Sequence, residues 1–155
     1  MNKKRNVGNL LPLIAAIFAI VAIFCAMAPG FSEASRGTGF IVMFGNQSNG
    51  KAPVAGLIVA FIVEILVAVV ALASMMVKGK GKFGLMLFVA AGSIAAAVLF
   101  LFAKNLYISA NASVDPIIVT DFKLGAGFIT SIVFDFLAAA AALLKVWLDN
   151  RKDED

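Results

Sequence analysis

The chain has 155 residues, of which 62% are hydrophobic and 14% are charged, and its formal net charge is +4. Soluble domains have about 45–50% apolar and about 25% charged residues, so this composition excludes an ordinary soluble fold. There is no histidine and only one cysteine, Cys25. An intramolecular disulfide is therefore impossible, and a zinc or haem site is not expected; we predict no cofactor.

Four long apolar runs predict four membrane-crossing helices. Each is close to the roughly 20 residues that a helix needs to cross a bilayer core, where the backbone must satisfy its own hydrogen bonds. We therefore predict an all-α membrane protein, a four-transmembrane-helix bundle that forms a single domain over residues 1–155. The predicted helices span about residues 10–28, 54–77, 83–103 and 124–148.

The first run has an alternative interpretation. A basic segment, Met1–Arg5, precedes it, and Ala26-Met27-Ala28 resembles the cleavage site of a signal peptide. The apolar run is long for the hydrophobic region of a signal peptide. We therefore predict a membrane helix.

The basic residues predict the orientation. Nine lie on the side of the two termini and the second loop, and four lie on the other side. The positive-inside rule then predicts that both termini are cytoplasmic, in a multi-pass protein of the plasma membrane. The Lys-rich N-terminus is more typical of bacteria. We expect the basic residues to set the orientation in the membrane and to contact anionic lipid headgroups, and we predict no binding to nucleic acid.

The two outer loops, about residues 29–53 and 104–123, each contain a β-branched, apolar stretch. These stretches are Phe40–Phe44 and Ile117–Thr120, and turn-forming residues flank both. The pattern predicts strands that could pair into a small extracellular cap. The alternative is that both loops dip into the membrane interface.

The sequence also contains a candidate internal repeat. The segment Ala55–Ile58 (AGLI) aligns with Ala126–Ile129 (AGFI), and a carboxylate follows each glycine by eight residues. These carboxylates are Glu64 and Asp135. We predict two related halves, although alanine-rich helices also match by chance.

Glu64 and Asp135 are the candidate functional residues, because each falls near the middle of its helix. A carboxylate at the bilayer centre is costly and usually faces the bundle interior or a wet cavity. Ser93 falls at the middle of the third helix, so we predict a polar layer of Glu64, Ser93 and Asp135. The layer could be a protonated pair that locks the helices, a proton or cation site, or a contact with another subunit.

Aromatic and aliphatic residues of the outer loops suggest a surface for association. We predict that Phe40, Ile41, Phe44, Ile117 and Ile118 contribute to it, and that Phe31 and Phe122 add further apolar outer surface. Folding back onto the membrane is the alternative. Two glycosylation sequons also lie in these loops, at Asn46 and Asn111.

No catalytic motif is present, so we predict a non-enzymatic protein with no catalytic residues and no metal site. The leading hypothesis is a structural or accessory subunit that forms a homo-oligomer or joins a larger membrane assembly. The alternative is a small proton- or cation-coupled transporter or channel subunit that uses Glu64 and Asp135. The predicted architecture, with four spans, cytoplasmic termini and a larger first outer loop with strand character, resembles that of tetraspan families such as the claudins. The first outer loop lacks the tryptophan and the cysteine pair of the claudin signature, so the resemblance implies no activity or partner.

Overall fold

The computed structural model describes residues 3–32, 37–46, 50–112 and 122–151. In this part of the chain the regular elements are all helices, and four of them are long and apolar enough to cross a membrane. The prediction of four such helices is therefore confirmed. The elements in chain order are α1 (Lys3–Met27), α2 (Gly39–Phe44), α3 (Ala55–Ser74), α4 (Lys80–Leu101), α5 (Ala103–Asn111) and α6 (Ala126–Asn150).

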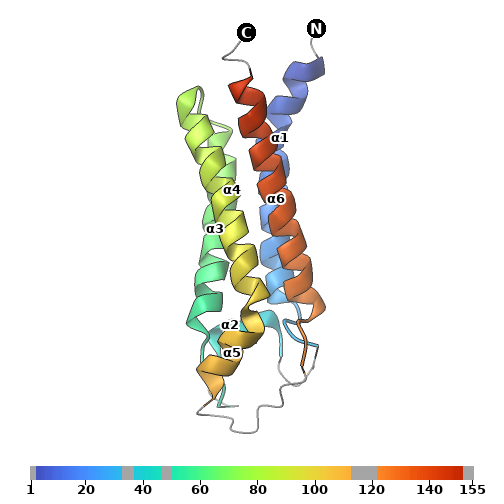
Figure 1. Cartoon of the computed structure of the whole chain (residues 1–155), viewed down its shortest axis with the longest axis vertical. Helices are drawn as coiled ribbons and strands as arrows, with labels where there is room; N and C mark the ends of the chain where they lie inside the picture. The colour runs from blue at the N-terminus through green and yellow to red at the C-terminus, as the bar shows by residue number, and fades with distance from the viewer. Residues whose placement is uncertain (1–2, 33–36, 47–49, 113–121, 152–155) are drawn as a thin grey trace.

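The four long helices form an elongated bundle, in which the start of α1 and the end of α6 lie at the same end (Figure 1). We call this the terminal end; it also holds the tight turn between α3 and α4. The opposite end, which carries α2 and α5, is the loop end. Helix α1 packs against α6 and α3, and α4 packs against the same two helices. Helices α3 and α6 therefore lie diagonally opposite each other across the core.

The outward faces of the long helices are apolar. Phe24 of α1 is 69% exposed, Val69 of α3 is 56% exposed, and Met76, just after the end of α3, is 87% exposed. A helix that is hydrophobic on all sides suits a membrane span, because lipid covers the face that the bundle does not. The structure is thus that of a multi-pass membrane protein.

The predicted strand at Phe40–Phe44 is wrong, because these residues form helix α2. The hydroxyl of Thr38 accepts a hydrogen bond from the backbone N–H of Ile41, which caps the helix start. Gly45, with a φ of 77°, ends the helix. The first residue, Gly39, lies so close to α1 that a Cβ there would be 1.8 Å from the carbonyl oxygen of Ala26. The other predicted strand, at Ile117–Thr120, lies outside the described residues.

The second loop is partly helical where no helix was predicted. Helix α4 ends at Leu101, and after Phe102 the chain continues in a new direction as α5 (Figure 1). The two loops do meet, but through other residues than predicted. The backbone of Ser32 donates to Lys123, and Gly125 donates to Gly30, over N···O distances of 2.9 and 2.8 Å.

The buried apolar residues form two clusters, one above the other along the bundle. The loop-end cluster includes Leu57 and Ala60 of α3 and Phe128 and Ile132 of α6. The terminal-end cluster includes Val67 and Ala71 of α3, Val89 and Ala90 of α4, and Ala141 and Ala142 of α6. On each long helix, the residues between the two clusters lie at the depth in the bundle that the sequence predicts for Glu64 and Asp135.

Candidate functional site

Glu64 and Asp135 lie between the two apolar clusters, and each is only 1% exposed. Their side chains extend from diagonally opposite helices, α3 and α6, and their carboxyl groups lie within hydrogen-bonding reach of each other. The hydroxyl of Ser131 donates to Glu64 Oε1 over 2.6 Å. The structure therefore brings the two predicted carboxylates together in the interior of the bundle.

Ser131 belongs to this site because of helical spacing. Residues four apart on a helix share a face, so Ser131 and Asp135 both point from α6 into the core. Both are buried. The polar layer predicted from the sequence did not include Ser131. The signal that could have found it is the i, i+4 relation to Asp135 on an otherwise small-residue face.

Ser93 lies at the same level on α4. Its neighbour Gly92 approaches α3 so closely that a Cβ there would be 2.6 Å from Val67 and 3.6 Å from Val63. These valines flank Glu64 along α3. Ser93 itself is fully buried, and its hydroxyl has no hydrogen-bond partner among the described residues. We call Glu64, Ser93, Ser131 and Asp135 the polar layer.

The polar layer needs a positive charge that its own side chains do not supply. An ionised carboxylate only accepts hydrogen bonds, so two facing carboxylates cannot bond to each other directly. Glu64 Oε2 and Asp135 Oδ2 accept no hydrogen bond from the described residues. The contact between the two groups therefore requires a proton, or another small cation, between them.

The nearest basic side chain on these helices is too far away to fill this role. Lys145 follows Asp135 by ten residues on α6, which is about 15 Å along a helix. The terminal-end cluster lies between them. Lys145 is instead paired with Asp149, one turn further along α6.

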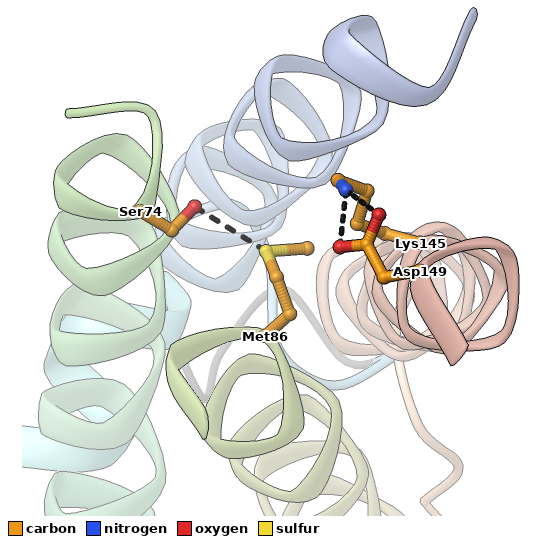
Figure 2. Close-up of polar contacts among 4 residues, drawn as sticks. All are labelled: Ser74, Met86, Lys145 and Asp149. Carbon is orange, nitrogen blue, oxygen red and sulfur yellow. Dashed lines mark hydrogen bonds and ion pairs between the residues drawn. The ribbon is translucent and has the colours of Figure 1, made fainter. Parts of the chain in front are cut away.

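Figure 2 shows the terminal end of the core, where the polar groups are matched. Both carboxylate oxygens of Asp149 contact the Lys145 ammonium. On the neighbouring helices, the hydroxyl of Ser74 donates to the carbonyl of Ala71 over 2.7 Å and also lies 3.3 Å from the sulfur of Met86. This end thus contains a buried serine with partners, in contrast to Ser93.

An aromatic cluster holds the loop end together. Phe31 contacts the rings of Tyr107, Phe122 and Phe128, with centroids 5.2, 4.8 and 5.7 Å apart. Phe31 is 2% exposed and Phe122 is fully buried. The prediction that these two phenylalanines add to an apolar outer surface is therefore wrong. They are core residues that connect the two loops to α5 and α6.

The predicted association residues fall into two groups. Phe40 and Phe44 are exposed on one face of α2, 46% and 39% respectively, and their rings are 4.6 Å apart. Ile41 is half-buried. Ile117 and Ile118 lie outside the described residues. The association surface stays a prediction.

Asn111, in the second sequon, is a structural residue. Its side chain is 2% exposed, accepts a hydrogen bond from the backbone N–H of Ala52 over 2.9 Å, and donates to the carbonyl of Tyr107 over 3.1 Å. The amide nitrogen that a glycan would occupy is therefore buried and bonded in the folded chain.

A functional hypothesis for this chain rests on the geometry of its buried polar residues. No protein-family model, curated protein sequence or solved structure matches this chain. Among the described residues there is no group of three or more His, Cys, Asp and Glu side chains that could hold a metal ion. The polar layer is the candidate site.

Proposed function

We propose that this chain is a non-enzymatic membrane protein that binds a proton or a small cation in its polar layer and moves it across the bilayer. One observation carries the proposal. Two carboxyl groups contact each other in the core, and no basic side chain of the described helices lies at their level. The positive charge that this contact needs must come from the medium. A group that takes its counter-charge from solution can also release it.

The location of the carboxyl groups favours this function over a contact with another subunit. Both are 1% exposed and meet inside one bundle, so neither is available to a neighbouring chain. Intramembrane carboxylates that face a bundle interior commonly mark ion or proton pathways. We further propose that both termini are cytoplasmic in the plasma membrane of a bacterium, because nine of the thirteen basic residues are assigned to that side.

A flux measurement tests the proposal. The full chain would be reconstituted into liposomes that contain a pH-sensitive dye, and proton movement would be followed after a pH step or a potassium diffusion potential. We expect flux above that of empty liposomes, and we expect Glu64→Gln and Asp135→Asn to lower it to that baseline. Asp149→Asn is the matched control, because it removes a carboxylate outside the polar layer. Equal flux in all variants and in empty liposomes would overturn the proposal.

A second candidate is a structural or accessory subunit of a larger assembly. The observation that favours it is the exposed pair Phe40 and Phe44 on α2. The ring of Phe44 also lies 6.1 Å from that of Phe61 on α3, between centroids. The mass of the purified chain in nanodiscs tests it. A defined oligomer that Phe40→Ser and Phe44→Ser convert to a monomer would support this candidate. A monomer in the unmodified chain would count against it.

A further inference from the structure

We infer that the polar layer binds one Na⁺ ion in exchange for one proton, an inference that rests on the proposed proton- or cation-binding function. The first observation is the pair of carboxyl groups described above. The second is independent of it: the hydroxyl of Ser93 is fully buried in the same layer and has no partner among the described residues. Buried polar side chains nearly always have a partner, so this hydroxyl needs an explanation.

A proton alone does not explain Ser93. A proton shared by two carboxyl groups uses one oxygen of each and needs no third oxygen. A hard cation, in contrast, collects oxygen ligands from several directions. The layer offers such oxygens from three helices: Glu64 Oε2 from α3, Ser93 Oγ from α4 and Asp135 Oδ2 from α6. The bond from Ser131 holds Glu64 Oε1, which leaves Oε2 for the ion.

Helix α1, the remaining long helix of the bundle, faces the polar layer with a small side chain. Ala22 of α1 is fully buried and lies between Ala19 of the terminal-end cluster and Ala26 of the loop-end cluster. It therefore falls at the level of the carboxyl groups and contributes only a methyl group. The ion's ligands from the protein come from the other three helices.

The small number of oxygen ligands in the layer favours a monovalent ion over Ca²⁺ or Mg²⁺. Ca²⁺ takes six to eight oxygen ligands, and Mg²⁺ needs a near-ideal octahedron, which is more than two carboxyl groups and a hydroxyl provide. With Na⁺, the exchange leaves the charge of the site unchanged. One O–H bond of a carboxyl group breaks, the proton leaves to the solvent, and Na⁺ takes its place between two carboxylates. The site carries a net charge of −1 before and after.

Few other groups can contribute a proton to this exchange. Within the four spans the titratable side chains besides Glu64 and Asp135 are Cys25, Lys82, Lys145 and Asp149, and the last three lie at the terminal end of the bundle. Cys25 of α1 is half-buried and lies one turn from Ala22 along the helix. On α4 the layer is faced by Ser93, which does not titrate. Cys25→Ser is therefore a necessary control.

The test uses the full chain in nanodiscs, in a weakly buffered solution with a pH indicator. NaCl is added, and choline chloride serves as the control for ionic strength. We expect about one proton released for each Na⁺ bound, and we expect the apparent Na⁺ affinity to fall about tenfold for each pH unit of acidification while the proton occupies the site. Cys25→Ser should leave the released proton unchanged.

Ser93→Ala separates this inference from the proposed function, because it leaves the carboxyl pair intact. We expect it to weaken Na⁺ binding about tenfold, while Ser74→Ala, which removes another buried hydroxyl, leaves Na⁺ binding unchanged. If NaCl releases no proton, or if Ser93→Ala binds Na⁺ normally, the inference is overturned. Proton flux that still depends on Glu64 and Asp135 would then leave the proposed function standing, and absence of that flux would remove both.

Discussion

The loop end and the polar layer are both buried parts of the same bundle, but they differ in how their polar groups are matched. At the loop end, both the oxygen and the nitrogen of the Asn111 side-chain amide form hydrogen bonds, and Phe31 is surrounded by other aromatic rings. In the polar layer, three polar oxygen atoms have no partner among the described residues. Under the proposed function, the loop end stabilises the fold, whereas the polar layer keeps oxygen atoms available for a ligand at the expense of stability. Substitutions at four places in the bundle test this difference.

The largest expected effect is at the centre of the aromatic cluster. Phe31→Ala removes a fully packed ring and leaves a cavity, so we expect the free energy of unfolding to fall by about 3–5 kcal/mol. Unfolding would be measured by circular dichroism in detergent during a thermal or denaturant titration. Phe24→Ala, which trims a ring that is 69% exposed, is the matched control and should stay within about 0.5 kcal/mol. Similar losses for both variants would mean that the loop end is not a stabilising core.

The next effect is expected at Asn111. Asn111→Ala leaves the buried N–H of Ala52 without its acceptor, which is expected to lower the free energy of unfolding by about 1–3 kcal/mol. Asn150→Ala, at an exposed position at the end of α6, should change it by less than about 0.5 kcal/mol. The same titration measures both. A neutral Asn111→Ala would show that the connection between the first loop and α5 contributes little.

The carboxyl pair should behave in the opposite way. Replacing both partners, as Glu64→Met together with Asp135→Leu, removes buried polar groups and fills their volume with apolar atoms. We expect unchanged or increased stability, by up to about 2 kcal/mol, together with complete loss of proton flux. Stability and flux would be measured on the same preparation. A strongly destabilised double variant would instead identify the pair as a structural lock.

The smallest effect is expected from Ser93. Its hydroxyl forms no hydrogen bond with the described residues, so Ser93→Ala should leave the free energy of unfolding within about 0.5 kcal/mol of the original or raise it slightly. Ser74→Ala removes a buried hydroxyl that does have partners, and it should cost about 1 kcal/mol. Reversal of this order would contradict the view that Ser93 is held for a ligand rather than for packing.

Sequence reasoning could predict the parts of the fold that depend on length and hydropathy. The four spans follow from apolar runs of about 20 residues, and the depth of Glu64 and Asp135 follows from their position within those runs. The short elements could not be predicted in the same way. In α2, a run of β-branched and aromatic residues favoured a strand, but the Thr38 cap, the close approach of Gly39 to α1 and the turn at Gly45 favour six residues of helix.

The candidate site was predictable in its residues but not in its connections. Hydropathy placed Glu64, Ser93 and Asp135 at one depth, but depth says nothing about which helices are neighbours. The meeting of Glu64 with Ser131 depends on α3 and α6 lying on a diagonal, which results from the packing of α1 and α4 between them. The same limit explains Phe31 and Phe122. Loop position suggested exposure, and only tertiary packing buries them.

The diagonal contact between α3 and α6 also has a consequence for biogenesis. Glu64 enters the bilayer with α3, but its partners Ser131 and Asp135 arrive only with α6, which is synthesised later. Until then α3 carries a buried carboxyl group without its partners, and α1 lacks α6, the helix against which it packs most extensively. Before α6 is inserted, this carboxyl group therefore lacks its buried hydrogen-bond partner, which is costly at the bilayer centre. Insertion of α6 is thus the step that gives the Glu64 carboxyl group its partners.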